Sequence, residues 1–120
     1  MNASEGAAES GTELPALCAH DVLSNSDLFY VHFDERGCSV TLGFSRVHGS
    51  EGFEFFLRFH DVRDVHVRGW GAPGRKDVHV ERVTDGTVQV SASSDGSSLR
   101  FRAADATLSR TRDFLASASS

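Results

Sequence analysis

The chain has 120 residues, which leaves room for one domain, and its net charge of −5 argues against general affinity for nucleic acid. Hydrophobic residues make up 39% of it, and nine Phe supply much of the bulk that a core needs. No apolar run approaches roughly 18 residues and no basic segment leads into an apolar start, so we expect a cytoplasmic protein that does not span a membrane.

The two ends of the chain differ in composition from the middle. Residues 1–13 are small, polar and acidic, which predicts a disordered tail, and residues 118–120 are expected to fray. Residues 14–117 are therefore predicted to form a single β-rich domain. Within it, Leu14, Leu17 and Cys18 have helical spacing, which indicates a single turn covering one end of the core.

From residue 28 onward, apolar residues recur at every second position, which is the period of a β-strand. Two such runs flank a turn at residues 34–37 and are predicted to form a hairpin. The first run places Phe29, Val31 and Phe33 on the core face and Tyr30, His32 and Asp34 on the other. The second run places Cys38, Val40, Leu42 and Phe44 on the core face.

The remaining strands are predicted at residues 53–59, 64–70, 77–83, 87–93 and 98–103, with Asp-Gly turns at 84–87 and 94–97. Asp105 is a candidate N-cap for a C-terminal α-helix over residues 105–117. The predicted fold class is therefore mainly β, with about seven sequential antiparallel strands and one helix. Because one short helix cannot cover seven one-sided strands, the sheet must roll into a barrel-like shape or fold over as a sandwich.

The tetrapeptide Asp-Val-His-Val occurs twice, and the two copies are predicted to pair as a hairpin between residues 62–69 and 76–83. This register places His66 opposite His79 and Asp64 opposite Glu81. Two imidazoles and two carboxylates can bind zinc, which makes this face a candidate metal site and the basis of a metal-dependent enzyme. A hydrated polar face is the favoured alternative, so no cofactor is expected.

The motifs of common enzymes are missing from the sequence, which contains no G-x-S-x-G, no Cys-x-x-Cys and no phosphate loop. We therefore expect a protein that is not an enzyme. Two cysteines are too few for a disulfide framework, although a Cys18–Cys38 bridge stays open. The predicted sheet also leaves open a small apolar ligand held inside it, lined by Phe side chains.

Three stretches, "LFYVHFDERGCSVTLGF", "FEFFLRFHDVRDVHVRGW" and "LRFRAADATLSRTRDFL", follow one another along the chain. Their hydrophobic spacing over residues 14–115 resembles the immunity protein 50 family of bacterial polymorphic-toxin systems. The resemblance implies a non-catalytic cytoplasmic protein that binds and neutralises a cognate toxin. An exposed acidic or aromatic patch would then bind the toxin, and the candidates are Tyr30, His32, Asp34, Glu35, Glu51, Glu54 and Trp70.

Overall fold

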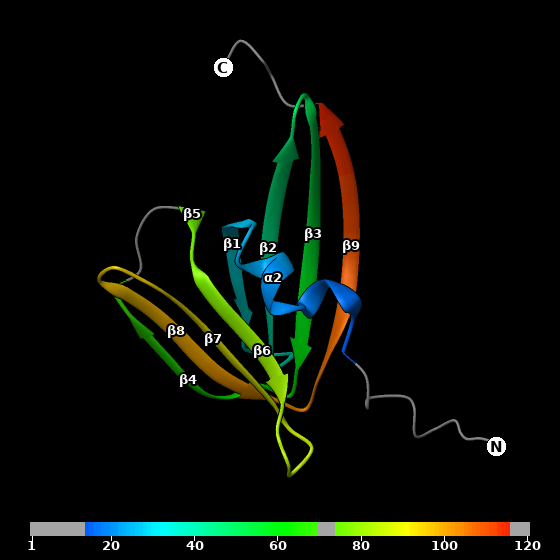
Figure 1. Cartoon of the computed structure of the whole chain (residues 1–120). Helices are drawn as coiled ribbons and strands as arrows, with labels where there is room; N and C mark the ends of the chain where they lie inside the picture. Colours follow the sequence, from blue (N-terminus) through cyan, green and yellow to red (C-terminus); the bar gives the residue numbers. More distant parts are fainter. Residues whose placement is uncertain (1–13, 70–73, 116–120) are drawn as a thin grey trace, which may run out of the picture.

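The computed structural model describes residues 14–69 and 74–115, and these form two antiparallel sheets that face each other (Figure 1). The predicted tails at residues 1–13 and 118–120 lie outside the described residues. The first sheet has the strand order β5-β1-β2-β3-β9 and the second has the order β4-β8-β7-β6. Their bounds are β1 Asp27–Asp34, β2 Ser39–His48, β3 Glu51–His60, β4 Arg63–Arg68, β5 Gly74–Arg75, β6 Asp77–Arg82, β7 Val88–Ser94, β8 Ser97–Ala103 and β9 Asp105–Leu115.

The prediction of a mainly β fold is confirmed, and the two separate sheets match its sandwich alternative rather than a closed barrel in the described part of the chain. The sheets are linked where β3 turns into β4, and this corner falls at His60–Asp61. There Asp61 has a φ of 54°, and the Val62 amide donates to the Cys38 carbonyl at 2.8 Å. Asp residues adopt this left-handed conformation more readily than most, so the corner suits the residue that occupies it.

Two short helical segments precede the first strand. These are the 3₁₀ turn η1, Ala16–Cys18, and the single turn α2, His20–Leu23. Cys18 and Leu23 are buried, and α2 lies between the two sheets (Figure 1). The predicted helical turn at residues 14–23 is thus confirmed as a cover for the core. Among the described residues, no helix has the length and apolar character needed to cross a membrane.

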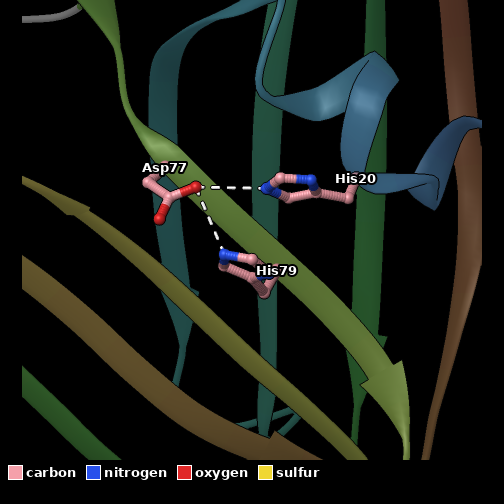
Figure 2. A group of neighbouring side chains, drawn as sticks. All are labelled: His20, Asp77 and His79. Atoms are coloured by element: carbon pink, nitrogen blue, oxygen red, sulfur yellow. Dashed lines mark hydrogen bonds and ion pairs between the residues drawn. The ribbon is translucent and has the colours of Figure 1, made fainter.

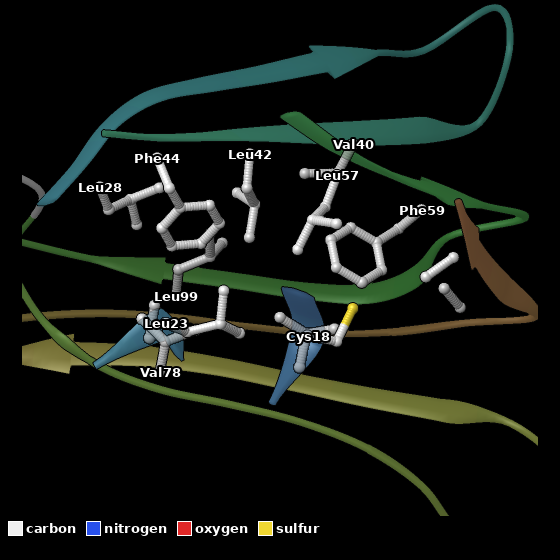
Figure 3. Close-up of a cluster of buried hydrophobic side chains, with 14 of the residues drawn as sticks. Cys18, Leu23, Leu28, Val40, Leu42, Phe44, Leu57, Phe59, Val78 and Leu99 are labelled. Carbon is white, nitrogen blue, oxygen red and sulfur yellow. The ribbon is translucent and has the colours of Figure 1, made fainter. Parts of the chain in front are cut away.

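The core is filled by the alternating apolar residues of both sheets (Figure 3). Fully burying one Leu, Val or Phe side chain contributes about 1.5–3 kcal/mol, so these alternating runs dominate the stability. The first sheet contributes to this core Leu28, Val40, Leu42, Phe44, Phe55, Leu57 and Phe59, and the second contributes Val78, Val88, Val90, Ala92, Leu99, Phe101 and Ala103.

The Asp-Gly turns at 84–87 and 94–97 connect β6 to β7 and β7 to β8, with Gly86 and Gly96 at positive φ.

The predicted C-terminal helix over residues 105–117 is wrong, because Asp105–Leu115 is a strand. It pairs with the free edge of β3 from His60↔Asp105 to Glu51↔Leu115, with one register shift beside Phe56. A helix satisfies its backbone groups locally, whereas this strand satisfies them across a long edge that would otherwise be open. Thr107 and Thr111, which are β-branched, also favour the extended form.

The predicted hairpin between residues 62–69 and 76–83 is also wrong. β4 pairs with β8 and β6 pairs with β7, so the two copies of Asp-Val-His-Val lie on opposite edges of the second sheet. The hairpins β6–β7 and β7–β8 close through short turns, and β4 then occupies the remaining edge of β8. Residues 70–73, which would connect the expected hairpin, lie outside the described residues.

Three inward placements on the first hairpin need correction, and the first is Phe33, which is 42% exposed near the end of β1. The register of β1 shifts between Leu28 and Tyr30, so Leu28 faces the core and Phe29 contacts Phe56 on the opposite side of the sheet. Such a bulge adds one residue to a strand and reverses the direction of its side chains. Cys38 ends the turn with a φ of 51° and is exposed. Both cysteines are free, which rules out the Cys18–Cys38 bridge in this structure.

Candidate functional site

An aromatic cluster lies on the outer face of the first sheet, which is the face turned away from the second sheet. A row of paired positions crosses four strands there, from Tyr30 on β1 through Gly43 and Phe56 to Arg110 on β9. The β1 bulge adds Phe29 to this row. Phe29, Tyr30, Phe56 and Arg110 are called the aromatic face below. Outer faces of antiparallel sheets are usually polar, so an aromatic row here is unusual.

The side chains of the aromatic face pack on one another in defined geometry. The Phe56 ring has edge-to-face contacts with Phe29 and with Tyr30, each at 5.7 Å between centroids. The Arg110 guanidinium carbon lies 4.4 Å from the Phe56 centroid, within the range of a cation–π contact. Phe56 is only 5% exposed, whereas Phe29 and Tyr30 are 37% and 41% exposed. Phe56 therefore lies at the base of the cluster, and the rings of Phe29 and Tyr30 are exposed to solvent.

Glycine is required beneath these rings. A Cβ atom at Gly43 would lie 2.6 Å from Cε2 of Phe56 and 2.8 Å from Cβ of Tyr30. The same device recurs at Gly52, where a Cβ atom would overlap the ring of Phe114 across the strand pair. A glycine whose place is filled by an aromatic ring on the adjacent strand is a recognised way to pack a sheet surface.

A shallow concavity of about 410 Å³ lies at the aromatic face. Its wall includes Glu54 and Arg112, which are ion-paired at 2.9 Å. His32 stacks beside Tyr30, with 6.2 Å between the ring centroids. The face thus combines exposed rings, a cation over a ring and a satisfied ion pair at its rim.

The predicted partner-binding residues divide into two groups in the structure. Tyr30, His32 and Asp34 alternate along β1, and Glu54 of β3 lies on the same outer face. Asp34 also accepts a hydrogen bond from the Gly37 amide at 3.1 Å, so it holds the turn. Two others lie at opposite ends of the sheet, because Glu35 is in the β1–β2 turn and Glu51 begins β3. Trp70 lies outside the described residues.

The sequence-based reasoning missed the residues that complete the cluster. Phe56 could be noticed as an apolar residue on the polar side of its strand, but its partners could not. Alternation predicts Phe29 in the core, because the bulge has no local signature. The predicted helix over residues 105–117 contains Arg110 and Arg112, so it does not place them beside Phe56 and Glu54.

The four predicted metal ligands do not come together. His66 lies opposite Arg100 and His79 lies opposite Ser91, so two strands separate the histidines. Three strand spacings of about 4.8 Å put them about 14 Å apart, whereas ligands of one ion lie about 2 Å from it. All four residues do line one concavity of about 480 Å³ on the outer face of the second sheet, which also contains Arg100 and Arg102.

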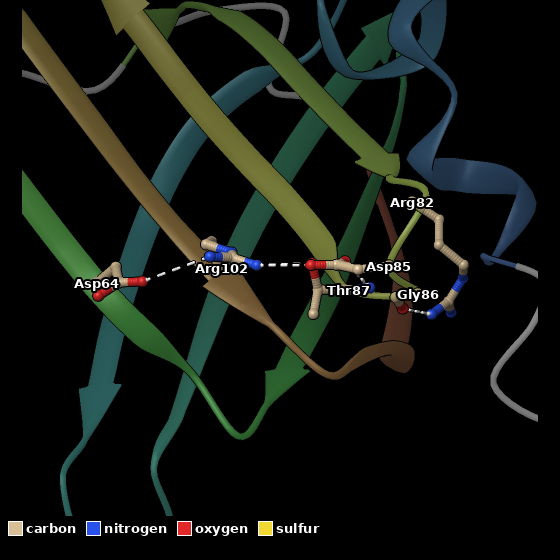
Figure 4. Close-up of polar contacts among 6 residues, drawn as sticks. All are labelled: Asp64, Arg82, Asp85, Gly86, Thr87 and Arg102. Atoms are coloured by element: carbon tan, nitrogen blue, oxygen red, sulfur yellow. Dashed lines mark hydrogen bonds and ion pairs between the residues drawn. The ribbon is translucent and has the colours of Figure 1, made fainter.

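Arg102 is committed to a polar network in this part of the sheet (Figure 4). It donates to the Asp85 carboxylate at 3.0 Å and lies 3.9 Å from a carboxylate oxygen of Asp64. The Thr87 amide and hydroxyl donate to Asp85 as well, and together with Arg102 they lower the pKa of that carboxyl group. The β6–β7 turn is thereby tied to β8, which is a structural role.

His79 instead meets two residues that the metal prediction did not include (Figure 2). The Asp77 carboxylate oxygen Oδ1 lies 3.1 Å from Nε2 of His20 and 3.2 Å from Nε2 of His79. These hydrogen bonds lower the pKa of Asp77, and the bond with His20 contributes more than the bond with His79. His20 is 57 residues from Asp77 in sequence, so no local pattern could have brought it into the group.

Fold and site together define a two-sheet antiparallel β protein with an aromatic face on one outer surface. No family model matches the sequence, and no curated protein or solved structure is similar to it at a significant level.

Proposed function

We propose that the chain is a non-catalytic protein-binding module, and that it acts as an immunity protein that neutralises a cognate bacterial toxin. The aromatic face is the observation that carries this proposal. Tyr and Arg are enriched among the residues that dominate binding energy at protein interfaces, and aromatic residues in general are enriched there. In this chain Tyr30, Phe29 and Arg110 share one patch, and the first two are exposed.

The geometry of the patch supports binding rather than a purely structural role. Its rings are held by Gly43 and Phe56 beneath them, so little conformational freedom remains to be lost when a partner binds. Phe56 is already buried, and the exposed area belongs to Phe29 and Tyr30. A partner that covers these two rings would bury apolar surface that the monomer leaves in water.

Charge supports a basic partner at longer range. The net charge of −5 attracts a positively charged toxin and speeds its association. A positive charge is expected for toxins that act on nucleic acid. Asp34 and Glu35 lie at one end of the first sheet and Glu51 at the other, so acidic residues flank the aromatic face at both ends. The rings then provide the short-range contact.

The alternative of a small apolar ligand held between the sheets receives less support. Phe44, Phe55, Phe59 and Phe101 point into that space and are fully buried, so the large side chains fill the interior themselves. The two concavities described above lie on outer faces. These observations favour a surface that binds a protein.

The test is neutralisation of a toxin domain, identified as a partner that copurifies with the tagged chain from its native host. The wild-type chain is expected to restore growth of cells that express the toxin domain. A Phe29→Ala/Tyr30→Ala double variant should lose protection, and its affinity should fall by roughly 30-fold or more, since a hot spot contributes at least about 2 kcal/mol.

The matched control is Val67→Ala, because Val67 is an exposed apolar residue on β4 of the other sheet. It should protect as well as the wild type. If the double variant folds, binds and protects like the wild type, the aromatic face is not the binding surface.

A further inference from the structure

We propose that His20, Asp77 and His79 form a binding site for one divalent transition-metal ion, with zinc the best fit to the ligand set. This inference is independent of toxin binding. The three side chains come from two elements, α2 and β6, and each offers one ligand atom. These atoms all lie within 4.8 Å of one another.

The two separations that involve Asp77 are close to those of a zinc site. Zinc binds imidazole nitrogen at about 2.0–2.1 Å and carboxylate oxygen at about 2.0–2.2 Å, usually in tetrahedral geometry. Two ligand atoms on such an ion are then about 3.3–3.5 Å apart. In this structure, Oδ1 of Asp77 lies 3.1 and 3.2 Å from the two Nε2 atoms (Figure 2). An ion could therefore enter with small side-chain rotations.

The backbone already holds the three groups in place. Asp77 and His79 are two residues apart on β6, so both side chains project from the same side of the strand. His20 begins α2, which is anchored by the buried Leu23 three residues later. The two imidazole rings stack with 4.1 Å between centroids and 17° between their planes. Ligands that need little reordering bind metal at a lower entropic cost.

An ion would replace the contacts that the ligands now make with one another. Metal ligands must be deprotonated, so Nε2 of His20 and of His79 would bind the ion in place of donating to Oδ1 of Asp77. All three side chains are more than half exposed. The fourth position would thus be open to water or to a donor group from a partner, as in three-ligand zinc sites.

A metal ion here would have a structural consequence. It would tie α2, at the start of the domain, to β6, which forms one edge of the second sheet. An ion that binds only the folded chain raises its melting temperature by mass action. The competing interpretation is a hydrogen-bonded cluster with no affinity for metal, and it predicts no such rise.

The experiment is a titration of the full, untagged chain with zinc chloride after removal of metal with EDTA and dialysis. Because exposed thiols also bind zinc, the parent for the titration is Cys38→Ser. One equivalent of zinc should bind by calorimetry, and the melting temperature should rise by several degrees. Cobalt should bind without the thiolate charge-transfer band, because the ligands are nitrogen and oxygen.

The variants His20→Ala and His79→Ala should each weaken zinc binding at least about tenfold and remove the thermal shift. His66→Ala is the matched control, since it removes an exposed histidine from the same sheet outside the cluster, and it should bind as the parent does. A parent that takes up no zinc at 100-fold molar excess overturns the proposal. So does unchanged zinc affinity in both cluster variants, because the ion would then lie elsewhere.

Discussion

Substitution of Gly43 by alanine tests whether the rings of the aromatic face lie directly on the backbone of β2. Gly43 does not adopt positive φ, so alanine meets no conformational barrier there. For an ordinary glycine in a strand, alanine is stabilising by about 0.5–1 kcal/mol, because it restricts the unfolded chain. The contacts above Gly43 reverse this expectation.

The added methyl carbon would lie 2.6 Å from Cε2 of Phe56 and 2.8 Å from Cβ of Tyr30. Cβ of Tyr30 is next to the backbone of β1, so it cannot move without the strand. Phe56 is packed under Phe29 and Arg110, so its ring has little room to retreat. Overpacking of this kind costs about 1–3 kcal/mol. After the backbone gain is subtracted, we expect Gly43→Ala to destabilise the fold by about 1–2 kcal/mol.

Urea unfolding followed by circular dichroism measures this change, and thermal unfolding should show a fall in melting temperature of roughly 5–10 °C. Gly37→Ala is the matched control, because its nearest contact is the flexible carboxylate of Asp34 at 3.1 Å. A change within about 0.5 kcal/mol is expected for that variant. In a Phe56→Ala background, the penalty at residue 43 should shrink by about 1 kcal/mol, since one of the two clashing groups is gone.

The sign of the Gly43→Ala effect is decisive. If the variant is more stable than the wild type, the rings do not rest on Gly43, and the described aromatic face is incorrect. If Gly43→Ala destabilises the fold equally with and without the Phe56 ring, the strain comes from Tyr30 of β1 alone, and the Phe56 ring does not lie over Gly43.

Three further predictions concern the rest of the fold. Native protein should expose one reactive thiol, Cys38, because Cys18 is buried and burial raises its pKa to about 12; a thiol count of one before denaturation and two after it checks this. Arg82→Ala should cost about 1–2 kcal/mol in urea unfolding, since Arg82 donates to Asp105 at 3.0 Å and to a backbone carbonyl at 2.6 Å; an unchanged midpoint contradicts this. Hydrogen bonds lower the pKa of Asp77, and the bond with His20 of α2 contributes more than the bond with His79 of β6. The ionised carboxylate therefore stabilises the fold at pH values above the ordinary pKa of Asp. This contribution is lost as the pH falls through the lowered pKa of the folded state. The difference in unfolding free energy between wild type and Asp77→Asn should shrink from about pH 4 downward, and a constant difference would show that the carboxylate contributes nothing.

Local patterns in the sequence identified the elements whose structure depends on near neighbours. The alternation of Val40, Leu42 and Phe44 predicted a strand and its buried face, and all three are buried. The Asp-Gly turns were predicted because glycine at positive φ is a local requirement, and Gly86 and Gly96 meet it. In both cases the governing interactions lie within a few residues.

The errors arise where a distant partner decides the outcome. Residues 105–115 have polar and β-branched residues that suit either a helix or a strand, and the open edge of β3 selects the strand. The bulge at Phe29 depends on how β1 meets β2, which no local pattern reveals. The histidine pairing failed for the same reason, because the positions of β7 and β8 separate His66 from His79.

The candidate site shows the same division. Tyr30 and His32 were predicted to be exposed on one face of a strand, and they are adjacent there. Phe56 joins them through the pairing of β3 with β2, and Arg110 joins through the pairing of β9 with β3, strands whose first residues are far apart in the chain. Likewise, His20 reaches Asp77 across 57 residues, so its role depends on the tertiary fold alone.

The central claim is that the aromatic face binds a protein toxin, and nuclear magnetic resonance mapping tests it most directly. The ¹⁵N-labelled chain is titrated with the purified toxin domain of the partner that copurifies with it from the native host. We predict that amide shifts and line broadening concentrate on β1, β3 and β9, around Tyr30, Phe56 and Arg110. Perturbations confined to the second sheet, or no change at saturating toxin, would contradict the claim.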